Sequence, residues 1–130
     1  MKPFSPRRRI PHSVLALVLF PFGIPTAHAA DINDGKAVFS RCAACHTNIK
    51  GGPNGIGPNL FGVVGRKAAA KPDFSYSTAL KNAHVVWTGQ TLNAWIANPA
   101  KMVPGTRMVF AGISDPKQRA DLIAYLATLK

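Results

Sequence analysis

Residues 42–46 read Cys-Ala-Ala-Cys-His, and they contain both cysteines of the 130-residue chain. Two thiols with this spacing lie within one helical turn, so each can form a thioether with one vinyl group of a haem. The imidazole of the next residue then lies under the iron, where it can serve as the proximal axial ligand. C-x-x-C-H is the attachment signature of haem c. The motif therefore predicts one covalent haem c, held by Cys42 and Cys45, with His46 on the iron.

Three other chemistries compete for the same residues. A thioredoxin-like pair needs a strand–turn–helix context, and nothing before Cys42 reads as a strand. A zinc site needs four ligands, but beyond residue 29 only His46 and His84 could join the cysteines, and Cys45 and His46 are adjacent. A disulfide across two residues would be strained. The sequence favours haem over all three.

The first 29 residues have the features of a secretory signal peptide. A basic n-region is followed by an apolar h-region at 14–20 and an A-x-A cleavage site at 27–29. A transmembrane anchor would need about 20 apolar residues, and Pro21 and Pro25 interrupt this run. We therefore expect export through the general secretory route, a periplasmic location and no transmembrane anchor.

Removal of this segment leaves one domain at residues 30–130, which is 101 residues long. A domain of this size buries a modest share of its surface, so an apolar cofactor would add substantially to its core. Without the leader's four basic residues, 12 Lys and Arg stand against five Asp, a net charge of +7. A basic surface suits acidic partner proteins. Nucleic acid is not an expected partner of an exported chain, and we expect a monomer.

Helical periodicity and capping residues predict an all-α domain. The first helix should span about 31–44 and carry the haem motif. Further helices should follow the capping residues Ser77, Thr88 and Asp115, the second of them ending near Asn98 because a proline comes next. The stretch 48–75 is rich in Gly, Pro and Asn. A loop this long is unusual in a small domain, unless it packs on the haem.

The sixth iron ligand is less clear from composition. After the leader the chain has two methionines, Met102 and Met108, both between Pro99 and Gly112. A thioether on the open iron face favours the reduced iron and so a fairly high potential. Spacing alone does not choose between the two.

Several motifs together resemble class I cytochrome c, especially its mitochondrial-like bacterial members. They are Gly35-x-x-Val38-Phe39-x-x-Cys42, Gly57-Pro58-Asn59-Leu60-x-Gly62-x-x-Gly65-Arg66, Phe74-x-Tyr76-Ser77, Trp87, Asn98-Pro99, residues 103–112 and residues 121–126. The resemblance implies a small monohaem fold in which the terminal helices cross, near Gly35 and Tyr125, and long loops wrap the haem. It also implies that Met108 is the sixth ligand and Met102 an ordinary loop residue.

The same resemblance assigns residues around the ligands. The Pro58 carbonyl should accept the other ring N–H of His46 and fix its tautomer. Arg66, Tyr76 and Trp87 should lie near the buried haem propionates, where hydrogen-bond donors offset the cost of burying negative charge.

The chain departs from the family pattern at three positions. Trp95 stands where many members have a tyrosine whose hydroxyl reaches the methionine sulfur, and an indole N–H is a differently placed donor. Ala100 and Arg107 stand where relatives often have lysine. The partner-facing positive charge is therefore thinner than in those relatives.

The motifs and the charge predict a soluble periplasmic electron carrier, not an enzyme. It would shuttle electrons between membrane complexes such as a quinol–cytochrome c reductase and a terminal oxidase, docking through a basic rim that includes Lys36, Lys50, Lys101 and Arg107. One alternative is a dedicated acceptor of a single periplasmic dehydrogenase. A haem peroxidase or gas sensor is less favoured, because each needs an iron position that opens, whereas Met108 would close it and His84 lies outside the ligand loop.

Overall fold

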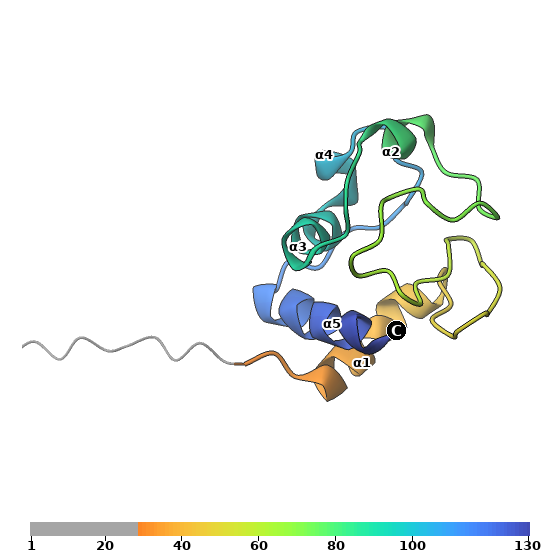
Figure 1. Cartoon of the computed structure of the whole chain (residues 1–130). Coiled ribbons are helices and arrows are strands. Elements are labelled where there is room, and N and C mark those ends of the chain that lie inside the picture. Colours follow the sequence, from red (N-terminus) through yellow and green to blue (C-terminus); the bar gives the residue numbers. More distant parts are fainter. Residues whose placement is uncertain (1–28) are drawn as a thin grey trace, which may run out of the picture.

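The computed structural model describes residues 29–130, and the predicted signal peptide lies outside this part apart from Ala29. Helices are its only regular secondary structure, apart from an isolated bridge between Lys67 and Val86. The helices are α1 (Ile32–Ala43), α2 (Thr78–Asn82), α3 (Gly89–Ala97), α4 (Pro99–Met102) and α5 (Pro116–Thr128) (Figure 1). The predicted all-α class is confirmed.

Side chains before the helices set where they begin. The Asp31 carboxylate accepts the backbone N–H groups of Asn33 and Asp34 at 2.7 and 3.0 Å, which caps α1. Thr88 and Thr91 form a reciprocal capping box at the start of α3. Such caps satisfy backbone donors that a helix cannot pair internally. Helix α3 therefore starts at the predicted cap Thr88, and α1 starts where helical periodicity placed it, with Asp31 as a cap that the sequence had not singled out.

Helix α4 is the element that the sequence pattern did not predict. Residues after Pro99 were expected to be a loop, yet Pro99 occupies the first helical position and the Asn98 side chain accepts the Lys101 N–H at 2.9 Å. Proline disfavours helix at the residue before it but fits the first position of a new helix. Pro99 thus ends α3 and starts α4.

The terminal helices α1 and α5 pack against each other, as Figure 1 shows. The contact is close at Gly35, where a Cβ atom would overlap the Asp121 carbonyl and lie 2.8 Å from the Tyr125 Cβ. The Phe39 and Tyr125 rings meet nearby, with centroids 5.6 Å apart. The predicted crossing at Gly35 and Tyr125 is confirmed, and it depends on the missing side chain of Gly35.

The remaining elements lie on two sides of the molecule. Helix α3 packs against both α5 and α4, and the long connection from α1 to α2 runs on the other side of the molecule (Figure 1). No helix of residues 29–130 is long and apolar enough to cross a membrane.

Candidate haem site

A cavity of about 550 Å³ lies between the helices and the long loops. Its volume falls in the range of binding sites for cofactors and small ligands, about 300–1,000 Å³. All eight predicted site residues line it: Cys42, Cys45, His46, Pro58, Arg66, Tyr76, Trp87 and Met108. Met102 is not among the lining residues. The fold therefore brings together residues that span 67 positions of the sequence, from 42 to 108.

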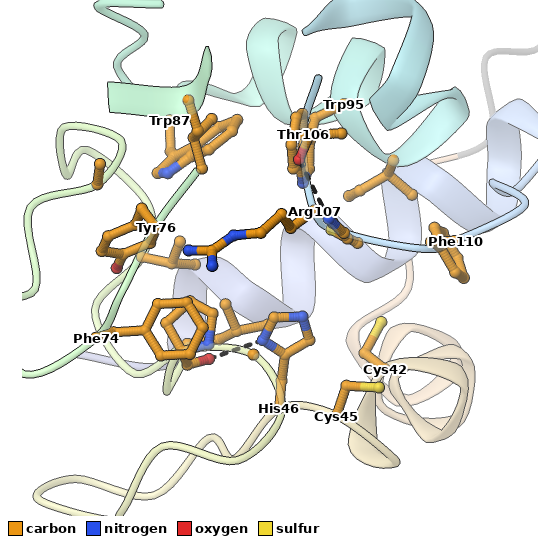
Figure 2. A pocket seen from close by; sticks show the side chains of 18 of the residues that line it. Cys42, Cys45, His46, Phe74, Tyr76, Trp87, Trp95, Thr106, Arg107 and Phe110 are labelled. Carbon is orange, nitrogen blue, oxygen red and sulfur yellow. Dashed lines mark hydrogen bonds between the residues drawn. The ribbon is translucent and has the colours of Figure 1, made fainter. Parts of the chain in front are cut away.

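The end of α1 presents the two cysteines to the cavity. The backbone N–H groups of Cys45 and His46 both donate to the Cys42 carbonyl, at 3.0 and 2.9 Å, so the motif continues the helical turn. Figure 2 shows the two sulfur atoms on one side of the His46 ring. Burial raises the pKa of the Cys42 thiol to about 11, against the opposing effect of Arg41. The thiolate is the reactive form of cysteine, so this buried environment favours the less reactive, protonated thiol.

The imidazole of His46 is held in one tautomer. Its Nδ1 atom lies 2.7 Å from the Pro58 carbonyl oxygen, the contact drawn as a dashed line in Figure 2. A carbonyl only accepts, so Nδ1 carries the proton and Nε2 keeps its lone pair. Burial lowers the pKa of His46, with the Pro58 hydrogen bond as the opposing effect, so the ring is neutral near pH 7. A neutral imidazole with a free Nε2 is what an iron ligand requires.

Gly57 makes space for this ring. A Cβ atom at Gly57 would overlap the His46 imidazole. The ring therefore lies directly on the backbone at Gly57, where any larger residue would displace it. The sequence motif includes Gly57, but its pattern did not reveal this contact.

Asn59 organises the loop behind Pro58, a role that the sequence analysis missed. The side chain belongs to a residue only 3% exposed. Its Nδ2 donates to the carbonyls of Ile49 and Gly52 at 2.8 and 2.9 Å, and its Oδ1 accepts the Phe61 N–H at 2.7 Å. Every polar atom of the side chain is thus paired. The only indication of this role in the sequence is that a polar residue directly follows Pro58, the predicted acceptor for His46.

Few hydrogen bonds hold the loop that carries Met108. Gly105 and Gly112, near its ends, have φ angles of +88° and +89°, which favour glycine. Inside the loop the Met108 N–H donates to Thr106 Oγ1 at 3.3 Å. In the described part of the chain, residues 104–112 are hydrogen-bonded to a distant segment only through Arg107. Its guanidinium donates to the carbonyl of Ser75 and contacts Ser75 Oγ at 3.4 Å.

The residues predicted near the propionates share the cavity but differ in their environment. Burial raises the pKa of Tyr76, so its hydroxyl stays protonated and able to donate. Arg66 donates to the carbonyls of Phe61 and Asn59 at 3.0 and 3.2 Å, and so also braces the loop. Their contacts with propionates remain a prediction.

Two buried tryptophans form one wall of the cavity. The rings of Trp87 and Trp95 have centroids 5.2 Å apart with an interplanar angle of 54°, and both line the cavity (Figure 2). Tilted pairs of this kind add to the stability from burial alone. The Trp95 side chain thus has a packing role at the position where it departs from the family pattern.

The donor set fits a haem better than a bare metal ion. Within residues 29–130, no three His, Cys, Asp or Glu side chains cluster as a metal site. The cavity is mainly apolar in its lining side chains, with two thiols, one neutral imidazole and one thioether facing it. The zinc alternative therefore finds no support.

A helical fold with crossing terminal helices around a C-x-x-C-H cavity is that of a class I cytochrome c. The family model described as "Cytochrome c" matches residues 32–130, and the chain belongs to the cytochrome c family. Cytochrome c2 of Rhodopila globiformis is 47% identical over 106 residues, which cover 81% of this chain and 99% of the relative. Cytochrome c of Euglena viridis is 50% identical over 101 residues, 77% of this chain and 98% of the relative.

A solved structure supports the same placement. Cytochrome cH from Methylobacterium extorquens matches with a TM-score of 0.72 and 47% identity, covering 76% of this chain and 99% of that one. Like other family members, the protein is an electron carrier rather than an enzyme, and it binds one haem c through Cys42 and Cys45.

Proposed function

We propose that this protein is a periplasmic single-haem carrier whose iron is ligated by His46 and Met108. The observation that carries this proposal is that both side chains line one cavity from two separate loops, next to the two cysteines. The haem iron, when bound, supplies a one-electron ferrous–ferric couple. His46 and Met108 would together hold the iron and would leave no position on it open to a substrate.

The two ligands contribute differently. His46 is neutral and is oriented by the Pro58 carbonyl, so it binds without losing a proton. The Met108 thioether favours the reduced iron and raises the potential. Arg66, Tyr76 and Trp87 supply donors toward the propionates, where they offset the cost of burying negative charge.

The surface near the cavity mouth suits transient docking. Val109 is fully exposed and Ile56 is 81% exposed, and both line the cavity. The basic residues Lys101 and Arg107 lie on α4 and in the Met108 loop, and both side chains are exposed. Arg107 also lines the cavity, and an apolar contact beside a positive charge favours rapid encounter with an acidic partner. We propose that such partners are membrane respiratory complexes, a quinol–cytochrome c reductase as donor and a terminal oxidase as acceptor.

Stopped-flow electron transfer to an acidic redox partner tests the docking proposal. The bimolecular rate should fall as salt rises, because the Debye length shrinks to about 8 Å at physiological ionic strength. Lys101→Gln should lower the rate at low salt more than Lys117→Gln, since Lys117 is already paired with Asp34 and Asp121. A rate independent of salt would contradict steering.

The location is tested by expressing the full chain and recovering the haem protein from the periplasmic fraction. Its N-terminal residue should be Ala30. Holoprotein that keeps residues 1–29 would contradict the signal-peptide assignment.

A further inference from the structure

We infer that a chain of hydrogen bonds runs from the surface carboxylate of Asp73 to the ring of His46 and lowers the reduction potential of the iron. This inference rests on the proposed role of His46 as an axial ligand. The chain has three links: Asn54 Nδ2 to Asp73 Oδ2 at 2.9 Å, Asn59 N–H to Asn54 Oδ1 at 2.8 Å, and His46 Nδ1 to the Pro58 carbonyl at 2.7 Å. We call it the Asp73 relay.

The links are continuous because amide groups join them. The Pro58 carbonyl and the Asn59 N–H belong to the same peptide bond, whose resonance couples its oxygen and nitrogen. The Asn54 side-chain amide couples its own oxygen and nitrogen in the same way. A hydrogen-bond acceptor at either N–H polarises the amide and places more negative charge on its oxygen. Hydrogen bonds in a chain strengthen one another in this way.

All three links polarise in one direction. The Asp73 carboxylate attracts the Asn54 N–H, and the enriched Asn54 oxygen attracts the Asn59 N–H. The Pro58 oxygen then becomes a stronger acceptor for the His46 Nδ1–H. A stronger acceptor at this position makes a metal-bound imidazole more basic. A more basic imidazole stabilises ferric over ferrous iron, so the potential falls.

The orientation of each amide is determined by its neighbours. The Asn54 side chain must turn its oxygen to the Asn59 N–H and its nitrogen to Asp73, where it also reaches the backbone carbonyl at 3.2 Å. The Asn59 side chain is not a link of the relay, but its nitrogen donates to the Ile49 and Gly52 carbonyls and so holds in place the residue whose backbone N–H is a link. A carbonyl cannot donate, so the Asn54 amide cannot be flipped without losing its bonds.

The outer end of the relay lies at the surface. The Asp73 side chain is 61% exposed, and Lys71 Nζ lies 3.6 Å from its Oδ1. The oxygen that accepts from Asn54 is Oδ2, so the lysine and the relay use different oxygens. The charge at Asp73 could also act on the iron through space, and the test must separate the two routes.

A double-mutant cycle on the holoprotein makes this separation. Asp73→Asn should raise the reduction potential, measured by redox titration, and so should Asn54→Ala. In the Asn54→Ala background, Asp73→Asn should add no further rise, because the route is already cut. If Asp73→Asn keeps its full effect in that background, or has no effect in either, the relay is refuted.

Asp115→Asn is the matched control. It also removes one surface carboxylate, and asparagine still caps α5, but Asp115 lies outside the relay. Its potential should stay at the wild-type value. An equal rise in this control would show that net charge alone sets the shift and would overturn the inference.

A second measurement reads His46 directly. In the ferrous holoprotein, the ¹H–¹⁵N resonance of His46 Nδ1–H should move toward that of a weaker hydrogen bond in Asp73→Asn. This variant is nearly isosteric and exposed, so it decides the matter even if Asn54→Ala yields no holoprotein. An unchanged resonance overturns the relay.

The optical spectrum keeps this outcome separate from the ligation itself. A sulfur-to-iron charge-transfer band in the oxidised wild type supports His46/Met108 ligation. If the band is present while the resonance and the potential do not respond, only the relay fails. If the band is absent, the proposed ligation fails.

Discussion

The loops on the two sides of the haem cavity are held in very different ways. On the His46 side, buried Asn59 binds three backbone groups and Arg66 binds two carbonyls. On the Met108 side, residues 104–112 reach a distant segment only through Arg107, among the hydrogen bonds of residues 29–130. The proposed ligand His46 therefore lies in a region that many protein hydrogen bonds hold in place, whereas the proposed ligand Met108 lies in a loop that few hold.

The two sides therefore suit different functions, tuning of the potential on the His46 side and local opening on the Met108 side. A rigid His46 side allows the protein to tune the potential through a fixed hydrogen bond. Regions with few hydrogen bonds open locally at lower free energy than the global fold. We therefore expect ligand exchange at the iron to occur on the Met108 side.

The largest expected effect comes from removing the Asn59 side chain, which holds the loop on the His46 side of the cavity. Asn59→Ala removes three partly buried hydrogen bonds, each worth about 1 kcal/mol, so the unfolding free energy of the ferric holoprotein should fall by about 3 kcal/mol. Asn48→Ala is the control, since its side chain makes one bond, to the Tyr125 hydroxyl at 2.7 Å, and should cost about 1 kcal/mol. Denaturant unfolding measures the unfolding free energy of both variants. An equal decrease in the two would show that Asn59 does not contribute more than a single hydrogen bond to the stability of this loop.

A smaller effect is expected in the loop that carries Met108. Arg107→Met keeps the side-chain length but loses the donors to Ser75, so the Met108 loop opens more easily. Added imidazole should then bind the ferric iron about tenfold more tightly, equivalent to about 1.4 kcal/mol. Lys101→Met is the control, because α4 holds this residue through its backbone. Similar imidazole affinities for the two variants would mean that the hydrogen bonds of Arg107 do not hold the Met108 loop closed.

The smallest effect concerns the terminal helices that support both loops. The hydrogen bond from Lys117, together with that from the Asp31 N–H, holds the pKa of the Asp121 carboxyl below its usual 3.8. A lowered pKa means that the ionised form stabilises the fold above pH 3.8, and this contribution is lost as pH falls through the folded-state value. Acid should therefore weaken the contact between α1 and α5.

We expect that the unfolding free energy of Asp121→Asn does not fall as the pH drops below 3.8 in the way that the wild-type value does. The Asp34→Asn variant should show the same fall as the wild type. Asp34 contacts the same lysine at 3.3 Å but is well exposed, so it contributes little. A wild-type acid profile unchanged by Asp121→Asn would place the acid-sensitive groups elsewhere.

The elements with local signals were predictable from the sequence. Ser77, Thr88 and Asp115 mark helix starts because their side chains satisfy backbone donors next to them. The C-x-x-C-H motif indicated the haem because its chemistry lies within five consecutive residues. Helix α4 was missed because Pro99 ends one helix and begins the next.

The long-range contacts of the site were not predictable in this way. The pairing of Asn54 with Asp73 joins residues 19 positions apart in loops without periodicity. Arg66 was expected to serve the propionates, and its bonds to the Asn59 and Phe61 carbonyls emerge only when the loop closes. Such contacts depend on loop geometry, which neither spacing nor composition records.

We propose that the iron has a firmly held ligand, His46, and a loosely held one, Met108. The optical spectrum of the oxidised holoprotein is the sharpest test of this ligation, with Met102→Ala as the matched control for Met108→Ala. We expect a sulfur-to-iron charge-transfer band in the wild type and in Met102→Ala, and no such band in Met108→Ala, whose iron should bind cyanide readily. A band that persists in Met108→Ala, or that is lost in Met102→Ala instead, would contradict the account.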